Sequence, residues 1–234
     1  MNRCNSRMQH YPQTLSININ QGSKTMNIVI IKYNAGNVQS VLYALERMGI
    51  TATVTDDHEA IQAADKVIFP GVGEASTAMH YLRKRKLDQV LKDLQQPVLG
   101  ICLGMQLMCA YSEENNTDCI GIFEEGVQRF SAGGPGNGQP AGDASLKVPQ
   151  IGWNNIFDLK TSLFSGVHEN AYIYLVHSYY AALGEHTIAT AHYGRDFSAA
   201  LHKRNFYGVQ FHPEKSAAAG EQVIKNFIEL VAGV

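Results

Sequence analysis

Between residues 26 and 101, short apolar runs alternate with segments of helical spacing, and this alternation constrains the fold more than any other feature. The runs expected to form strands span residues 27–33, 51–55, 66–69 and 97–101. The segments expected to form helices span residues 38–48 and 58–64, with a long charged helix inside 73–94. Strands that alternate with helices are typical of βαβ units, so the first half of the chain is predicted to build a parallel sheet.

The second half of the chain has a different pattern, because its apolar runs follow one another without helical segments between them. These runs span residues 126–130, 172–182, 187–193, 199–202 and 207–211, and an amphipathic helix is expected over 220–234. We therefore expect antiparallel additions to the parallel sheet. The predicted fold class is α/β, with an open mixed sheet and helices on both faces. Residues 131–143, rich in glycine and proline, are expected to form an exposed loop.

The composition of the chain limits the kinds of binding partner and the cellular compartment that we expect. The chain has 234 residues, 45% of them apolar, and a net charge of −2, so neither nucleic acid nor a membrane is expected as a partner. The four cysteines lack paired C-x-x-C spacing, which favours a reducing, cytoplasmic location. The sequence contains neither metal-ligand spacing nor a phosphate-binding glycine loop, so no metal and no cofactor are expected.

Residues 1–25 differ in composition from the rest of the chain, being rich in Asn, Ser and Gln and lacking any acidic residue. Such a segment is typical of a disordered leader, and an expression-derived extension or an upstream start codon gives the same composition. We therefore expect a single domain over residues 26–234, which is long enough to bury a sizeable core.

A cysteine flanked by glycines follows the last strand of the parallel pattern. Gly100 and Gly104 lie two residues before and two residues after Cys102, and a helix-like segment follows. This spacing is typical of a nucleophile elbow, in which the reactive atom sits on a strained turn that excludes bulky neighbours. The positive end of a helix dipole also favours the thiolate. The alternative is a core residue, since free cysteine is often buried, and the pentapeptide alone does not decide between the two.

A cysteine nucleophile needs a base, a group that orients the base, and donors for the oxyanion. His212 and Glu214 are the candidate base and orienting group, because they follow an apolar run and residues two apart in an extended segment face the same side. In an α/β fold, ligand sites form at this carboxyl edge of the sheet. A Pro-Gly-x-Gly run supplies further candidates, although it is equally often a plain turn. The candidate oxyanion donors are the backbone amides of Gly71, Val72, Gly73 and Leu103.

The glycine turn, the elbow cysteine and the later His-Pro-Glu motif occur in an order that resembles the class I (triad) glutamine amidotransferases, which have a flavodoxin-like open sheet. Within that class the chain is similar to the glutaminase subunits of imidazole glycerol phosphate synthase, an enzyme of histidine biosynthesis. The resemblance extends from Met26 to the C-terminus and rests on residues 33–37, 70–73, 100–106, 146–154, 176–179 and 211–216.

The resemblance implies a role for each motif. Cys102 would attack the side-chain amide of glutamine, and His212, oriented by Glu214, would transfer the protons. Ammonia would pass to a (β/α)8-barrel cyclase subunit in a heterodimer, and the isolated chain would hydrolyse glutamine poorly. By the same resemblance, the residues that hold glutamine are Gln106, Glu114, Ser178 and Tyr179, and those at the partner interface are Asn37, Trp153, Tyr174 and Lys215.

Several alternatives stay open. The glutaminases of anthranilate, GMP or carbamoyl phosphate synthesis share the triad, although Met105 stands where the anthranilate and carbamoyl phosphate enzymes usually carry His. A non-catalytic scaffold and a stand-alone cysteine hydrolase also fit the fold. The chain departs from the family pattern at Lys32 and Asn34, where aspartate and glycine are more common. This departure bears on the partner interface more than on the chemistry.

Overall fold

A computed structural model describes residues 26–33, 38–131 and 146–230. The expected leader, Asn37, most of the 131–143 loop and the end of the last helix lie outside the described residues. The first half contains β1 (Ile28–Ile31), α1 (Val38–Arg47), β2 (Ala52–Thr55), α2 (His58–Gln62), β3 (Lys66–Gly71), α3 (Ala75–Lys84), α4 (Leu87–Asp93), β4 (Val98–Cys102) and α5 (Leu103–Met108). The second half contains β5 (Tyr111–Ser112), β6 (Thr117–Asp118), β7 (Gly126–Arg129), β8 (Gln150–Phe157), η1 (Ser162–Phe164), β9 (Ala171–His177), β10 (Tyr179–Ala181), β11 (Thr187–His192), β12 (Asp196–Lys203), β13 (Phe206–Val209), η2 (Pro213–Lys215) and α6 (Ala217–Glu229).

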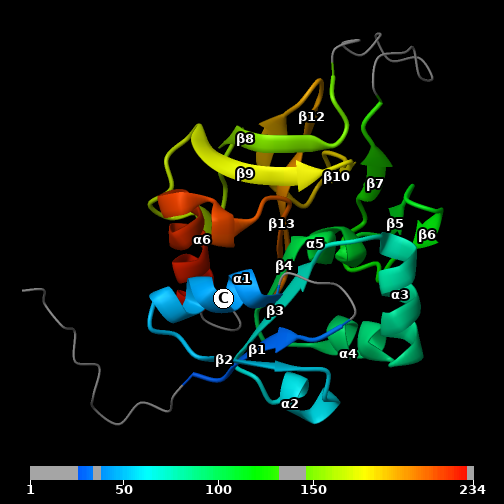
Figure 1. The fold of residues 1–234 in the computed structure, drawn as a ribbon, viewed down its shortest axis with the longest axis vertical. Helices are drawn as coiled ribbons and strands as arrows, with labels where there is room; N and C mark the ends of the chain where they lie inside the picture. The colour runs from blue at the N-terminus through cyan, green and yellow to red at the C-terminus, as the bar shows by residue number, and fades with distance from the viewer. Residues whose placement is uncertain (1–25, 34–37, 132–145, 231–234) are drawn as a thin grey trace, which may run out of the picture.

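A mixed sheet runs through the described residues in the order β2-β1-β3-β4-β13-β12-β10-β7-β5-β6 (Figure 1). Strands β2, β1, β3, β4 and β13 are parallel, whereas β12 is antiparallel to β13. Strands β11, β8 and β9 continue from β12 as an antiparallel branch. The predicted change from a parallel to an antiparallel arrangement is confirmed. Because β13 lies beside β4, the chain that leaves β13 reaches the same carboxyl edge of the sheet as Cys102.

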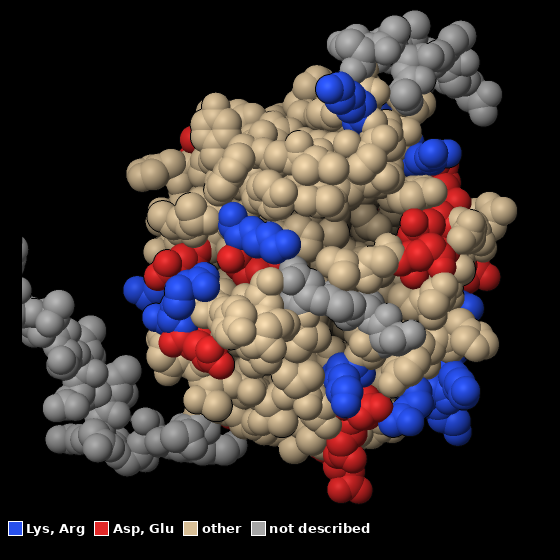
Figure 2. All heavy atoms as spheres, viewed as in Figure 1, with Lys and Arg blue, Asp and Glu red and all other residues tan. Residues whose placement is uncertain are grey.

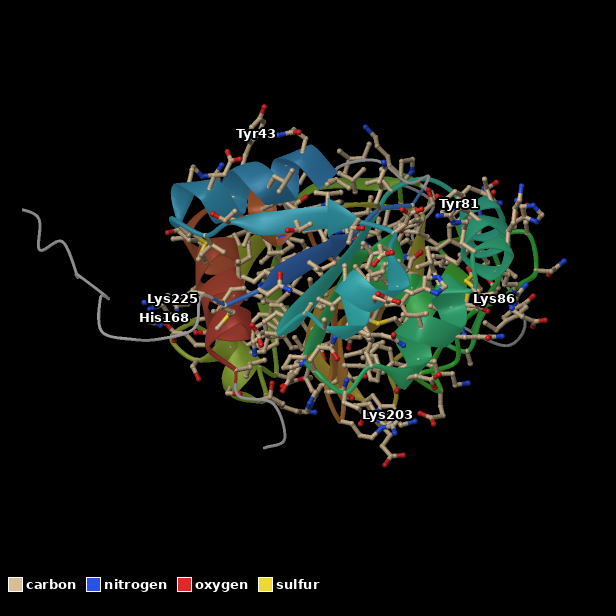
Figure 3. All side chains as sticks on the ribbon, turned by 90° about the horizontal axis from the view of Figure 1, so that it is seen from below. Tyr43, Tyr81, Lys86, His168, Lys203 and Lys225 are labelled. Carbon is tan, nitrogen blue, oxygen red and sulfur yellow. The ribbon has the colours of Figure 1, made fainter. Side chains whose placement is uncertain are left out.

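Helices cover both faces of the parallel strands. Helices α1 and α6 lie on one side, and α3 and α4 lie on the other (Figures 1 and 3). The alternation along β1 explains why two layers form, since Val29 and Ile31 pack in the cluster with α3, α4 and α5, and Ile28 and Ile30 pack in the cluster with α1 and α6. Among the described residues, no helix combines the length and the apolar character needed to cross a membrane.

The main differences from the sequence prediction concern four segments. The single helix expected within 73–94 is two helices, because Lys86 adopts a left-handed conformation with φ of 55° between α3 and α4. The strand expected over 172–182 is divided at Ser178 into β9 and β10, which pair with different neighbours. Strand β8 carries no sequence prediction, because its glycine and asparagines interrupt the apolar alternation. β3 continues two residues further than predicted, through Gly71.

Candidate active site

The strand, sharp turn and helix expected around the cysteine are present. Cys102 ends β4 with φ 54° and ψ −110°, a conformation that L residues rarely adopt and that surrounding structure must hold. A β-carbon on Gly104 would lie 1.8 Å from the carbonyl oxygen of Phe69, and one on Gly100 would lie 2.4 Å from Cε of Met108. The glycines on both sides of the cysteine are therefore required by close contacts.

The His-Pro-Glu segment lies against this turn. Nδ1 of His212 is 2.9 Å from Oε1 of Glu214, and both side chains are buried. The main chain of His212 is held on both sides, since its N–H donates to the carbonyl of Tyr174 at 3.0 Å and its carbonyl accepts from Oγ of Ser216 at 2.7 Å. Ser216 Oγ in turn accepts from the N–H of Tyr174 at 2.9 Å. Strand β9 thus fixes the position of the histidine through main-chain contacts.

The charge state of His212 depends on its two neighbours. Burial alone would lower the pKa of this imidazole, but hydrogen bonds and charge interactions with Cys102 and Glu214 outweigh burial and raise the pKa of His212 to about 10. The imidazole is therefore protonated at neutral pH beside the cysteine and the carboxylate. This arrangement suits an imidazolium that stabilises a thiolate and can give its proton to a leaving group.

The sulfur of Cys102 has polar neighbours on two further elements. It lies 3.9 Å from the carbonyl oxygen of Val176 on β9 and 3.7 Å from Nε2 of Gln210, which follows β13. Gln106 on α5 donates from Nε2 to the carbonyl of Tyr179 at 2.8 Å and to Oε1 of Gln210 at 2.9 Å. Main-chain carbonyls and amide side chains therefore surround the thiol.

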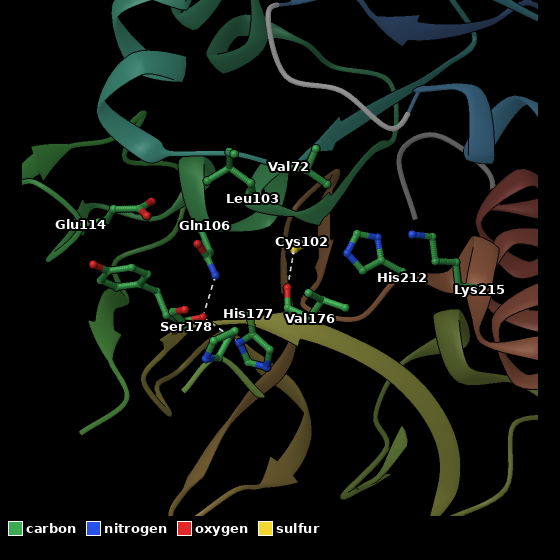
Figure 4. Close-up of a pocket in the computed structure, with 13 residues that line it drawn as sticks. Val72, Cys102, Leu103, Gln106, Glu114, Val176, His177, Ser178, His212 and Lys215 are labelled. Atoms are coloured by element: carbon green, nitrogen blue, oxygen red, sulfur yellow. Dashed lines mark hydrogen bonds between the residues drawn. The ribbon is translucent and has the colours of Figure 1, made fainter. Parts of the chain in front are cut away.

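A cavity of about 350 Å³ opens at this edge of the sheet (Figure 4). In Figure 4, Val72 and Leu103 lie on one side of the cavity, Val176, His177 and Ser178 lie opposite them, and Cys102 lies between. The cavity brings together most of the residues predicted from sequence. Its lining includes Val72, Gly73, Cys102, Leu103, Gln106, Glu114, Ser178, Tyr179, His212 and Lys215.

The other predicted residues lie nearby or outside the described part. Gly71 ends β3 beside Cys102, where a β-carbon would meet the hydroxyl of Tyr33 at 2.1 Å. Trp153 is 54% exposed and packs edge-on against Tyr174, with ring centroids 5.9 Å apart. Asn37 falls outside the described residues.

Some residues of the site carry no sequence prediction. Gln210 lies two residues before His212, and Ser216 lies two residues after Glu214. Their closeness to the His-Pro-Glu motif in the sequence is the feature from which they could have been predicted. His177 is buried, and Nδ1 donates to the carbonyl of Tyr179 at 2.7 Å. Burial lowers the pKa of His177 to about 4, against a smaller opposing effect of that hydrogen bond, so the ring is neutral.

One group of side chains in the described residues has the composition of a cation site. Glu124, Glu125 and His186 offer ligand atoms within 4.8 Å of one another. The group combines adjacent carboxylates with a histidine far along the chain, a pattern that ligand spacing in the sequence does not reveal. Glu124 already pairs with Lys203, whose charge balances it without a metal, and it also contacts Nε2 of His186.

Comparisons with known proteins agree with the geometry. The sequence profile of the family "Glutamine amidotransferase class-I" matches residues 29–230. The HisH subunit of imidazole glycerol phosphate synthase from Bacteroides fragilis is 56% identical over 205 residues, which cover 88% of this chain and all of that protein. The HisH subunit from Haemophilus influenzae is 44% identical, covering 88% of this chain and 98% of that protein.

Solved structures show the same fold at lower identity. A crystal structure described as a glutamine amidotransferase superposes with a TM-score of 0.64 at 18% identity, covering 88% of this chain and 99% of that one. The structure of PurLQS from Thermotoga maritima superposes with a TM-score of 0.62 at 15% identity, covering 88% of this chain and 98% of the matched one. At these identities the likeness concerns the fold alone.

The profile match and the shared fold place the chain in the class I glutamine amidotransferases, which are α/β enzymes. Within that class it belongs to the family of HisH subunits, the glutaminase subunits of imidazole glycerol phosphate synthase. The curated relatives at 44–56% identity are HisH subunits, so the glutaminases of anthranilate, GMP and carbamoyl phosphate synthesis are not favoured.

Proposed function

We propose that the chain hydrolyses glutamine at Cys102 and delivers the ammonia to a (β/α)8-barrel cyclase subunit during histidine biosynthesis. The observation that carries this proposal is that Cys102 and His212 line one cavity, while Glu214 contacts Nδ1 of His212 at 2.9 Å. Each group needed for covalent acyl transfer is present there: a nucleophile, a proton carrier and a carboxylate that orients the carrier.

The reaction follows from the protonation states of these groups. The thiolate of Cys102 forms a bond to the amide carbon of glutamine, and the carbonyl oxygen takes the negative charge. Val72, Gly73 and Leu103 line the cavity, and we propose that their backbone amides hold this oxygen. The imidazolium of His212 gives its proton to the departing nitrogen, which leaves as ammonia with the bond to carbon broken. His212 then takes a proton from water, whose oxygen displaces the sulfur and releases glutamate.

Polar groups further along the cavity suit the amino acid part of glutamine. Gln106, Glu114, Ser178 and Tyr179 line this end of the site. Oε2 of Glu114 already accepts from the N–H of Ala75 at 2.8 Å, and burial raises the pKa of Glu114. A carboxylate in such a place favours a positively charged ligand group, which in glutamine is the α-ammonium.

The surface above β8 and β9 suits a protein partner. Ile151, Trp153 and Tyr172 are more than half exposed there, and Figure 2 shows few charged side chains over this part of the molecule. Apolar and aromatic surface of this kind is typical of interaction sites. Lys215 lies between this surface and the cavity, because it lines the cavity and also lines, together with Trp153, a second hollow. The three cysteines in the described residues are unpaired, which agrees with a cytoplasmic location.

A single substitution tests the proposal. Cys102→Ala should reduce glutamine-dependent synthesis by the assembled enzyme about 10³-fold or more, because it removes the nucleophile. Synthesis from added ammonium salts should continue at the wild-type rate, since this route does not use the thiol. Cys119→Ala, at a half-buried cysteine outside the cavity, is the matched control and should leave both reactions unchanged.

The outcomes separate the competing hypotheses. Full glutamine-dependent activity in Cys102→Ala would contradict the proposed role of the thiol and favour a scaffold. Loss of both the glutamine-dependent and the ammonia-dependent reactions would instead assign Cys102 to folding or assembly. Rapid glutamine hydrolysis by the chain without any partner would favour a stand-alone hydrolase.

A further inference from the structure

We infer that Gln210 is a positioning residue for the nucleophile: its buried amide presents an N–H group to the sulfur of Cys102 and thereby favours the thiolate. The inference rests on the proposed function, because it assigns this residue a part in preparing the same cysteine for attack. No side chain of the His-Pro-Glu pair supplies this contact, which approaches the sulfur from a separate amide network.

The network begins at a main-chain group whose chemistry is unambiguous. The carbonyl of Tyr179 can only accept hydrogen bonds, so the atom of Gln106 that faces it at 2.8 Å must be Nε2. The same nitrogen lies 2.9 Å from the amide of Gln210, and the atom there must accept, so it is Oε1. With its oxygen fixed in this direction, Gln210 turns Nε2 toward the sulfur, 3.7 Å away.

This chain of contacts matters because the two amide atoms of a glutamine are easily exchanged by a half-turn. Each of the three amide contacts is set by the one before it, and the first is set by the backbone. The orientation of Gln210 is therefore built into the fold and does not depend on a ligand. Since both N–H groups of Gln106 are used, only its Oε1 remains to accept from glutamine.

The surroundings make the N–H contact effective. Gln210 is fully buried, and Cys102 is 6% exposed. In a buried environment, an N–H donated to a charged sulfur stabilises it more than one donated to a neutral thiol. The carbonyl of Val176, 3.9 Å from the sulfur, suits the thiol instead, because only a protonated sulfur can donate to it. These two contacts therefore act in opposite directions on the formation of the thiolate.

The other titratable groups near the sulfur differ in how they affect the formation of the thiolate. Protonated His212, held by Glu214, favours the thiolate, whereas Tyr33 and His177 are neutral because burial raises the pKa of the first and lowers that of the second. Glu114 and Lys215 line the same cavity with opposite charges. These groups stay in place when Gln210 alone is changed.

The test measures thiolate formation without turnover. Alkylation of Cys102 by iodoacetamide, followed by mass spectrometry of its peptide in the full chain, reports the thiolate fraction as a function of pH. Gln210→Met keeps the side-chain volume but removes the N–H. We expect the pH midpoint of alkylation to rise by about one unit, with about tenfold slower alkylation at pH values well below the wild-type midpoint. Gln210→Glu, which replaces the donor with an acceptor, should raise the midpoint at least as far.

A second route changes the network from its other end. Gln106→Met releases the amide of Gln210, which can then rotate, so we expect a smaller rise of the midpoint in the same direction. This variant also serves if a substitution at the fully buried Gln210 prevents folding. Ser198→Ala is the matched control, because Ser198 is fully buried on neighbouring strand β12 and its hydrogen bonds do not lead to Cys102.

The outcomes are decisive. If the alkylation profiles of Gln210→Met and Gln106→Met superimpose on the wild type, while both lose thermal stability as Ser198→Ala does, the amide network is only structural and the inference is overturned. Because alkylation needs neither glutamine nor a partner, this result would leave the proposed glutaminase intact. Conversely, shifted profiles together with an active Cys102→Ala enzyme would overturn the proposed function alone.

Discussion

The two walls of the cavity contribute to the site in different ways. The wall formed by β4 and α5 supplies side chains, namely the thiol of Cys102 and the amide of Gln106. The wall formed by β9 and β10 supplies mainly carbonyl groups, since the main chains of Val176 and Tyr179 face the sulfur and the amide network. Side-chain chemistry leaves a signature in the sequence, but a main-chain carbonyl leaves almost none.

The difference also predicts how each wall responds to mutation. The first wall depends on close contacts that only glycine permits, so single substitutions there should be severe. The second wall depends on backbone position, which many side chains can maintain, so single substitutions there should be mild. His212 and Glu214 lie between the walls and should show an intermediate effect.

The largest effect is expected for Gly104→Ala in the first wall. The added β-carbon would lie 1.8 Å from the carbonyl oxygen of Phe69, and relief requires movement of backbone. We expect a loss of about 3 kcal/mol or more in the free energy of unfolding, measured by urea denaturation. Gly126→Ala is the matched control, because its β-carbon would have no neighbour within 4 Å. Equal stabilities of the two variants would show that the elbow is not tightly packed.

An intermediate effect is expected for Glu214→Gln, which removes the charge of one of the two groups that raise the pKa of His212, the other being Cys102. The pKa of His212 is raised to about 10 in the folded chain, against about 6.5 when unfolded, so this proton stabilises the fold below pH 6.5. The stabilisation is lost as the pH rises from about 6.5 to about 10. At pH 7 the free energy of unfolding of the variant should be about 2 kcal/mol lower than that of the wild type. Above pH 7 the free energy of unfolding should fall less steeply with pH in the variant than in the wild type.

This prediction is checked by urea denaturation at a series of pH values. Glu46→Gln, at an exposed position on α1, is the matched control and should follow the wild-type curve. If the free energy of unfolding falls with rising pH equally steeply in Glu214→Gln and in the wild type, the carboxylate does not govern the charge of the imidazole.

The smallest effect is expected for His177→Leu in the second wall. This change removes two hydrogen bonds of the ring, one to the carbonyl of Tyr179 and one to the side chain of Gln150, while Gln106 still donates to the carbonyl of Tyr179. We expect a loss of about 1 kcal/mol in the free energy of unfolding at pH 7. The pKa of His177 is lowered to about 4, so the wild type also loses stability as the pH falls from about 6.5 to 4, and the variant should lose less over this range.

Urea denaturation at acid and neutral pH again supplies the measurement. His168→Leu, at an exposed histidine labelled in Figure 3, should match the wild type at both. If His177→Leu lowers the free energy of unfolding as much as Gly104→Ala does, the two walls do not differ in their tolerance of substitution.

The same contrast explains how much could be predicted from the sequence. The elbow at Cys102 and the His212–Glu214 pair are local patterns, and the alternation of strands and helices places them at one edge of the sheet. The pairing of β8 with β9 is less local, because it joins residues as far apart in the sequence as Gln150 and His177, which are 27 positions apart. The break at Lys86 also lacks a signal, since a lysine in the left-handed conformation is not marked as a glycine would be.

The parallel pairing of β4 with β13 fixes the relative positions of the site residues along the strands. Ile101 pairs with Val209, so the hydrogen-bond ladder sets Cys102 and Gln210 at the same height along the sheet, one strand spacing apart. On the other side of β4, the same ladder sets Gly71 beside Cys102. Inserting one residue into β13 would displace everything beyond it by about 3.3 Å and turn its side chains to the opposite face. Strand length is therefore as strongly constrained in this enzyme as the identity of the residues that react.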